Sequence, residues 1–244
     1  MSKKVVITGA NQRIGLFLCG YFLSLGYDII AVVRVAKREL KTLKVLNHNR
    51  IEIIEKDFNK STIDTLFWNS LSEHDIAGFI HCASTFKYDD VISTNDDLLK
   101  EQQKVNCNVF IDACTSYCQS EHKGKTPTSF IAFLDAKLEQ LNKDHYSYTL
   151  SKLQLKASIP FLAMSCAPYL RVNAISPGLT LRSGEQTQEQ FEEAQASLPL
   201  GFGPNLEDIA QSTAFLLMMQ SVTGQIITVD AGQHLQSKKD IIFQ

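Results

Sequence analysis

The chain lacks the features that mark several large classes of protein. Its 244 residues carry a formal net charge of only -2, without a basic stripe to bind a phosphate backbone, so we expect no nucleic-acid partner. No stretch approaches the ~20 apolar residues that span a bilayer, so we expect no membrane contact. With 44% hydrophobic residues, a chain of this length can bury a core without disulfides or metals.

Cysteine chemistry also has little support. None of the six cysteines forms a C-x-x-C pair, and no cysteine–histidine cluster has the spacing of a zinc site. Cys114 and Cys118 could share a helix face, which we interpret as packing. Free thiols fit a reducing compartment, and polar residues 11–13 interrupt the first apolar run too early for an export signal. We therefore expect a cytoplasmic protein that needs no metal.

Short apolar runs alternate with helical stretches along the whole chain. Continuous rather than alternating apolar runs favour a parallel sheet that is covered on both faces. No linker or repeat divides the chain, so residues 1–244 are expected to form a single Rossmann-type αβα sandwich with a mostly parallel, doubly wound sheet of about seven strands. Strands are expected at 5–8, 28–33, 51–54, 76–81, 129–134, 170–175 and 226–229, and helices at 14–25, 98–118 and 148–167.

Residues 178–205 form the one irregular region, and their centre is rich in glutamine and glutamate. A long insertion late in a doubly wound fold is often a lid over the ligand crevice. A solvated surface helix with no role in binding fits the same composition, so both interpretations stay open.

The first expected strand runs into a turn that contains two glycines. Such a turn lets backbone N–H groups approach a pyrophosphate that lies on a helix N-terminus. The G-x-G-x-x-G pattern is not met, because Arg13 stands where a glycine is usual. The predicted cofactor contacts in this turn are Gly9, Asn11, Gln12, Arg13, Ile14 and Gly15.

The residues after the second and third strands indicate which dinucleotide is bound. Enzymes that use NAD tend to place an acidic residue after the second strand, whereas this chain has Arg34. The planar guanidinium suits a 2′-phosphate, so we predict NADPH, with a merely solvated basic patch as the alternative. Asp57 is predicted to reach the adenine amine, although it could equally cap a helix.

Tyr148 and Lys152 stand four residues apart, and Asp135 stands thirteen residues before Tyr148. On a helix, positions i and i+4 share a face. A phenol has a free pKa of roughly 10, and a nearby ammonium lowers it. The pair could therefore give a proton to a substrate that receives a hydride. Taken alone, the Y-x-x-x-K pattern is weak, because many surface helices carry it by chance.

In combination, these residues resemble the short-chain dehydrogenase/reductase family over essentially the whole chain. Two positions narrow the resemblance to the pteridine reductase and dihydromonapterin reductase subgroup, since Asp135 replaces the usual serine and Arg13 the usual glycine. The matching pieces are Thr8-Gly9…Gly15, Asp57, Cys82-Ala83-Ser84, Phe86, Asn106, Tyr148…Lys152, Asn173…Pro177-Gly178 and Thr223-Gly224-Gln225…Val229-Asp230-Ala231-Gly232-Gln233-His234-Leu235.

The resemblance implies NADPH-dependent reduction of a dihydropterin to its tetrahydro form. The pterin would stack between the nicotinamide and Phe86. Arg13 would serve both the cofactor phosphate and the polar edge of the pterin, and Ser84 would bond either ligand. Asp135 would bind the substrate and share its proton with Tyr148, the proton donor or relay.

The resemblance also implies roles on the cofactor side. Lys152 would hold the nicotinamide ribose, and Asn106 would order a water chain behind it. A homotetramer would form through the helices that contain Asn106 and Tyr148. Further cofactor contacts would come from Ala83, Ser84, Tyr148, Lys152, Pro177 and Gly178.

The aspartate has a physical logic of its own. A serine donates to a carbonyl oxygen, whereas pterin N–H and amine groups want an acceptor. An ionised carboxyl raises the pKa of a neighbouring phenol, so we expect Asp135 and Tyr148 to titrate together, with a pH optimum on the acid side. The family's two asparagines before the alanine are His81-Cys82 here, which is expected to remove a polar contact near the adenosine.

Alternatives remain at the level of the residue and of the protein. Phe86 could be ordinary core, Asn106 could bond within its helix, and Asp135 could form a turn; His145 is expected to be a loop residue. The chain could instead reduce a carbonyl compound such as a 3-oxoacyl thioester, or sense a dinucleotide without catalysis. The sequence does not distinguish dihydromonapterin, dihydrobiopterin and dihydrofolate as substrates.

Overall fold

A single parallel sheet forms the centre of the molecule. The computed structural model describes residues 2–48, 50–121, 126–182, 184 and 186–236. Seven strands pair in parallel in the order β3-β2-β1-β4-β5-β6-β7, which confirms the doubly wound parallel sheet. The strands are β1 (Lys4–Thr8), β2 (Asp28–Val33), β3 (Ile51–Glu55), β4 (Ile76–His81), β5 (Thr128–Phe133), β6 (Leu170–Pro177) and β7 (Ile226–Val229).

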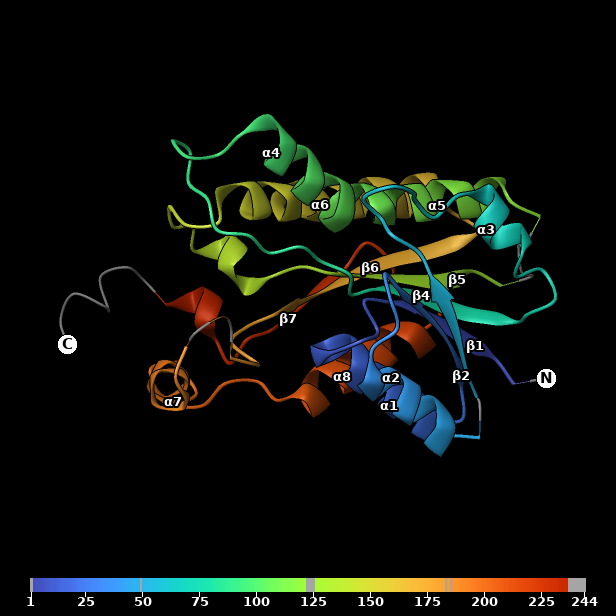
Figure 1. Cartoon of the computed structure of the whole chain (residues 1–244), viewed down its shortest axis with the longest axis horizontal. Coiled ribbons are helices and arrows are strands. Elements are labelled where there is room, and N and C mark those ends of the chain that lie inside the picture. The colour runs from blue at the N-terminus through green and yellow to red at the C-terminus, as the bar shows by residue number, and fades with distance from the viewer. Residues whose placement is uncertain (1, 49, 122–125, 183, 185, 237–244) are drawn as a thin grey trace.

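Helices cover both faces of this sheet. Figure 1 shows α4, α5 and α6 on one face and α1, α2 and α8 on the other. No helix was expected at α2, α3 or α8, and a surface helix was one of the two interpretations of the segment that contains α7. The α-helices are α1 (Arg13–Ser24), α2 (Arg38–Leu46), α3 (Thr65–Asn69), α4 (Asp96–Gln103), α5 (Val109–Gln119), α6 (Tyr146–Ser165), α7 (Gln188–Ala196) and α8 (Leu206–Met218), with short 3-10 turns η2 (Ala136–Glu139) and η3 (Gln233–Leu235).

The core consists of one apolar cluster on each face. Trp68, Phe110 and Phe130 are fully buried between the sheet and the layer of α5 and α6. On the other face, Phe22 and Leu40 are fully buried with residues of α1, α2 and α8. Because both faces are covered, the central strands can be continuously apolar, which is the pattern that predicted them.

The long helix expected at 98–118 is interrupted. It begins at Asp96, and a π turn, η1 (Lys104–Asn108), separates α4 from α5. Single π turns inside α-helices occur frequently at functional sites. This one carries Asn106, which is fully buried.

The strand order determines where a ligand would bind. From β1 the sheet extends through β2 and β3 on one side, and it continues with β4 to β7 on the other side of β1, so the strand order reverses at β1. In open parallel sheets, ligands bind outside the carboxyl ends of the strands at such a switch point. Among the residues described, no helix combines the length and apolar character needed to cross a membrane.

Candidate active site

A phenol and a carboxylate meet at the carboxyl end of β5. Asp135 follows this strand, and its Oδ1 accepts the N–H of Lys137 at 2.9 Å, which caps η2. Tyr148, in the first turn of α6, donates its hydroxyl to Asp135 Oδ2 at 2.9 Å. Asp135 is therefore both the turn former of the alternative interpretation and the partner of Tyr148.

Lys152 lies one helical turn after Tyr148 and is buried, with 3% of its surface exposed. Its Nζ donates to the carbonyl of Phe133 at 2.6 Å and lies 5.9 Å from the centre of the Tyr148 ring. Burial lowers the pKa of Lys152 to about 8, although Asp135 acts in the opposite direction. The ammonium, the phenol and the carboxylate thus gather in one place.

The expectation that Lys152 lowers the pKa of the phenol is wrong for this structure. Burial and, after it, the charge of Asp135 raise the pKa of Tyr148 well above its usual range. A buried phenolate loses its hydration, and the neighbouring carboxylate repels it. Tyr148 is therefore held as a protonated donor.

Asn106 fastens the loop that follows β4. Its Oδ1 accepts the N–H of Thr85 at 2.8 Å and the hydroxyl of Ser84 at 3.1 Å. Its amide donates to the carbonyl of Thr85 and to the hydroxyl of Ser151, at 3.0 Å each. The side chain thus joins the π turn, the β4 loop and α6, rather than bonding only within its own helix region.

His81 makes a second connection that the sequence did not predict. Its Nε2 lies 3.0 Å from the carbonyl of Val105 and its Nδ1 lies 2.9 Å from the hydroxyl of Thr8. Burial, with a contribution from Lys152, lowers the pKa of His81 to about 3. The neutral ring therefore donates from Nε2 and accepts at Nδ1, and Thr8 in turn accepts the N–H of Ala83 at 3.1 Å.

Phe86 is not ordinary core, because half of its surface is exposed. Its ring stacks on His145, with centroids 3.9 Å apart and planes 17° from parallel. The Phe86 ring also meets Tyr148 edge-to-face, with centroids 4.7 Å apart. An exposed aromatic face therefore lies beside the proposed proton donor.

The turn after β1 fits a pyrophosphate. Gly9 has φ +68°, and a Cβ there would lie 2.7 Å from the backbone nitrogen of Ala83. A Cβ at Gly15 would collide with the carbonyl oxygen of Gly9. α1 begins at Arg13, within this turn, without a side-chain cap from Gln12 and without an acidic residue in its first turn. Its amide-rich N-terminus therefore suits an anion.

Arg13 connects this turn to the irregular segment. It adopts φ 53°, a left-handed conformation that is uncommon for a residue other than glycine. Its guanidinium donates to the carbonyls of Arg182 at 2.7 Å and Leu181 at 3.3 Å. Before Arg13 could serve a ligand phosphate or a pterin edge, these contacts would have to be shared or released.

The other nucleotide residues lie around the same turn. Asn11 donates to the carbonyl of Val35 at 2.8 Å and accepts the N–H of Lys37 at 3.0 Å, which ties the β1 turn to the β2 loop. Arg34 is exposed directly after β2. Asp57 caps a turn through Asn59 N–H at 3.0 Å and no α-helix begins there.

Segment 178–205 reaches the same end of the sheet. It follows Pro177, where Gly178 donates its N–H to the carbonyl of Val229 at 2.9 Å. It contains α7, none of whose residues is buried, although Gln195 donates to the carbonyl of Leu179 at 2.9 Å. One part of the segment, α7, is thus a surface helix, and another part is bound to Arg13 through the carbonyls of Leu181 and Arg182.

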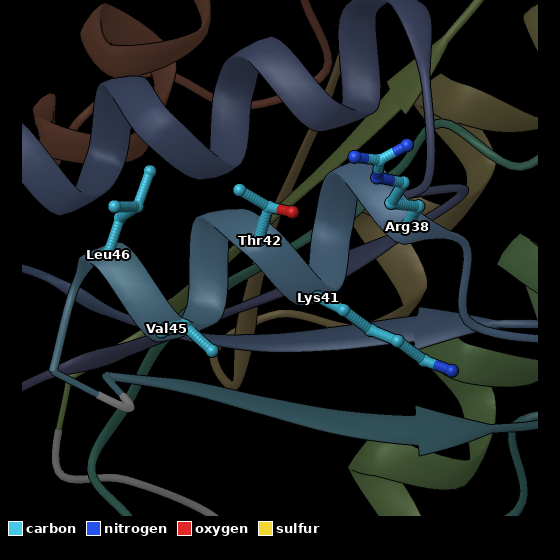
Figure 2. A pocket seen from close by; sticks show the side chains of 5 residues that line it. All are labelled: Arg38, Lys41, Thr42, Val45 and Leu46. Carbon is cyan, nitrogen blue, oxygen red and sulfur yellow. The ribbon is translucent and has the colours of Figure 1, made fainter.

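Two hollows of the described surface lie away from these residues. One of about 480 Å³ is lined by Arg38, Lys41, Thr42, Val45 and Leu46, all from α2 (Figure 2). Another of about 590 Å³ lies at the amino ends of the strands. Neither contains a predicted site residue. In the part of the chain that the structure describes, no group of three or more His, Cys, Asp or Glu residues could hold a metal ion.

Comparison with known proteins agrees with this arrangement. A family model described as Enoyl-(Acyl carrier protein) reductase matches residues 9–234. A dihydromonapterin reductase of Citrobacter koseri is 25% identical over 236 residues, which cover 95% of this chain and 97% of the relative. The corresponding protein of Escherichia coli (strain SMS-3-5) is 24% identical over 236 residues, with the same coverage.

Solved structures show the same fold. FolM alternative dihydrofolate reductase 1 from Brucella canis, complexed with NADP, superposes with a TM-score of 0.88 and 26% identity, covering 97% of this chain and 95% of that one. The homologous protein from Brucella suis, also with NADP, has a TM-score of 0.88 and 26% identity, covering 97% of this chain and 96% of its own.

The parallel sheet, the glycine turn and the tyrosine–lysine pair, together with the match over residues 9–234, show that the chain belongs to the short-chain dehydrogenase/reductase family of oxidoreductases. Within this family it lies in the pteridine reductase and dihydromonapterin reductase subgroup, as the aspartate and arginine positions predicted.

Proposed function

We propose that this protein reduces a dihydropterin to its tetrahydro form with NADPH. The observation that carries the proposal is the hydrogen bond from Tyr148 to Asp135, 2.9 Å long, beside the half-exposed ring of Phe86. The relatives named dihydromonapterin reductase and alternative dihydrofolate reductase, the latter bound to NADP, support it. When bound, NADPH supplies the hydride.

Asp135 selects for the substrate. The edge of a pterin presents ring N–H and amine donors, which an anionic acceptor binds better than a serine hydroxyl does. The carboxylate keeps one oxygen on Lys137 N–H and the other on the Tyr148 hydroxyl, so its position is fixed before a substrate arrives. Phe86 would offer its exposed face to the flat heterocycle.

Tyr148 would supply or relay the proton. Its raised pKa keeps the phenol protonated throughout the physiological range. The proton would go to the imine nitrogen beside the carbon that receives the hydride, and a proton from solvent would then restore the phenol, which Asp135 holds by its hydrogen bond. The buried ammonium of Lys152 would stabilise the charge that develops on the phenol oxygen.

The fold supports the residues that we propose for binding the dinucleotide. The turn from Gly9 to Gly15 and the N-terminus of α1 would hold the pyrophosphate. Arg34 would bind the 2′-phosphate and Asp57 would lie toward the adenine. The remaining proposed contacts are Asn11, Gln12, Arg13, Ile14, Ala83, Ser84, Tyr148, Lys152, Pro177 and Gly178.

A second candidate is reduction of an acyl thioester. It is favoured by the description of the matching family model, Enoyl-(Acyl carrier protein) reductase. Asp135 argues against it, since a carbonyl oxygen requires a donor where this residue offers an acceptor. A dinucleotide sensor without catalysis is less consistent with a tyrosine and a lysine that are both in place.

The decisive experiment measures NADPH oxidation by the purified protein. Dihydromonapterin, dihydrobiopterin and dihydrofolate are compared with an acetoacetyl thioester and an enoyl thioester at equal concentrations. We expect turnover with at least one dihydropterin and a far lower kcat/KM with both thioesters. Turnover with a thioester alone would replace the proposal by the second candidate, and turnover with none of them would favour the sensor.

We also propose a cytoplasmic homotetramer that assembles through the helical stretch of α4, η1 and α5, which contains Asn106, and through α6, which contains Tyr148. The outer side of α6 exposes three large apolar side chains, Leu150, Phe161 and Met164, with 45%, 66% and 69% of their surfaces accessible. Such a face favours association with a second copy. Light scattering after size exclusion should give four times the chain mass, and a monomeric mass would contradict the proposal.

A further inference from the structure

The N-terminus of α6 is capped by a residue from a distant loop. His145 precedes the helix with φ 55° and makes no side-chain cap. Instead, the backbone carbonyl of Asp89 accepts the N–H of Tyr146 at 3.2 Å. Both carboxylate oxygens of Asp89 lie 3.2 Å from the N–H of Ser147. The first two amides of a 20-residue helix are therefore satisfied by one residue, 57 and 58 positions earlier.

Asp89 is well placed to hold this end of the helix. Only 2% of its surface is exposed, so water competes little for its carboxylate. A negative charge at a helix N-terminus is favoured by the helix dipole. Tyr148 follows Ser147 directly, so the position of its phenol depends on where the helix starts.

The loop that carries Asp89 also carries Phe86. The two segments make further contacts: His145 Nδ1 lies 3.0 Å from the carbonyl of Lys87, the rings of Phe86 and Tyr88 pack on His145, and Phe86 meets Tyr148 edge-to-face. The aromatic face and the phenol are therefore mounted on one joined unit. Asp89 is the buried polar anchor of that unit.

We propose that Asp89 is a positioning residue for the reduction: by capping α6 from the loop that carries Phe86, it fixes the Tyr148 phenol against the bound substrate. This inference rests on the proposed function. Asp89 touches neither substrate nor cofactor in this role, and it acts through Tyr148 and Phe86. A misplacement of ~1 Å at a reacting group can lower the rate on the order of 10²-fold, so a positioning residue can have a catalytic effect of that size.

Three substitutions test the proposal. Asp89→Ala removes the cap, Asp89→Asn keeps an oxygen acceptor of the same shape, and Asp64→Ala is the matched control. Asp64 caps α3 through Phe67 N–H at 2.9 Å and lies outside the proposed site. We measure kcat and KM for the dihydropterin, the Kd of NADPH and the thermal midpoint of each variant.

Asp89→Ala should lower kcat roughly 10- to 100-fold and raise the KM of the dihydropterin, with the Kd of NADPH changed less than about twofold. Asp89→Asn should stay within about threefold of the wild type, because its amide oxygen still accepts from Ser147. Asp64→Ala should lower the thermal midpoint while kcat stays unchanged. If Asp89→Ala left kcat and KM unchanged, or if the two alanine variants lost activity alike, the role assigned to Asp89 would be wrong.

Hydrogen exchange supplies a readout that does not need turnover. Amides at 145–148 should exchange faster in Asp89→Ala than in the wild type, and those of α3 should not. Unchanged exchange at 145–148 would overturn the proposal even if no dihydropterin proved to be a substrate. A wild type that reduces no dihydropterin, with faster exchange in Asp89→Ala, would count against the proposed function and leave the cap established.

Discussion

A buried cation lies at each end of the sheet, and the two cations differ in their hydrogen-bond partners. At the carboxyl end, Lys152 is 3% exposed and donates to the single carbonyl of Phe133. At the amino end, Arg171 is 4% exposed, and its two terminal nitrogens donate to the carbonyls of Leu216 and Leu217 at 2.8 Å each. These carbonyls lie at the last turn of α8, where a positive charge is favoured.

The difference shows that a buried charge does not by itself mark a catalytic site. Arg171 completes the end of a helix, and it lines the hollow of about 590 Å³ at the amino ends of the strands. Lys152 lies near a phenol that donates to a carboxylate, next to an exposed aromatic ring. The chemistry requires buried titratable groups that act on one another beside an exposed aromatic ring, as Lys152, Tyr148 and Asp135 do at the carboxyl end.

Removing the phenol at the carboxyl end should cause the largest loss of activity. Tyr148→Phe deletes the proton donor and leaves the ring packing with Phe86, so kcat for dihydropterin reduction should fall roughly 10³-fold. NADPH oxidation under saturating substrate measures it, and an unchanged thermal midpoint of the variant is the control. A loss below tenfold would mean that another group donates the proton.

Replacing the carboxylate should have the next largest effect. Asp135→Ser restores the residue usual in the family and removes the acceptor for pterin donors, so kcat/KM for the dihydropterin should fall about 10²-fold. Turnover of an acetoacetyl thioester should rise in the same variant. Equal changes for both substrates would show that Asp135 does not choose between them.

The pH profile should reveal the cation at the carboxyl end. Lys152 has a pKa of about 8 and is an ammonium below that value and a neutral amine above it. Tyr148 has its pKa raised and stays protonated over the same range. The kcat/KM for the dihydropterin should therefore decline about tenfold per pH unit above this value. A flat profile into the alkaline range would contradict the assignment.

Changing the cation at the amino end should affect turnover least. Arg171→Met removes two hydrogen bonds to buried carbonyls, of which Leu216 keeps the Ser129 hydroxyl as a donor, so the free energy of unfolding should fall by about 2 kcal/mol. Urea unfolding measures this loss, and the kcat should remain within about twofold of the wild type. A strong loss of kcat in a variant that is still fully folded would show that Arg171 contributes to catalysis, contrary to the contrast drawn with Lys152.

The sheet was predictable because continuous apolar runs form buried parallel strands, and β2, β4 and β7 match their expected bounds. The spacing of Asp135, Tyr148 and Lys152 was sufficient to predict that these residues meet, because it is a property of one strand end and one helix. The pKa of Tyr148 was predicted in the wrong direction, since spacing carries no information about burial.

Contacts between residues that lie far apart in the chain could not be predicted from the sequence. The Asp89 carboxylate reaches a residue 58 positions away, and His81 bonds to residues 24 and 73 positions away. Neither has a local pattern that indicates its partner. The π turn was missed for a related reason, because its residues continue a helical pattern while the hydrogen bonding changes.

That π turn has a consequence for insertions and deletions. A π turn holds one residue more than the α-helical turn it replaces, so deleting a single residue within 104–108 would let α4 and α5 merge into one regular rod. The rod would gain better backbone geometry, but every side chain beyond the deletion would rotate by about 100° about the axis. Asn106 could then no longer face Thr85 and Ser151 together. The π turn therefore sets how the side chains of α5 are rotated about the helix axis relative to those of α4.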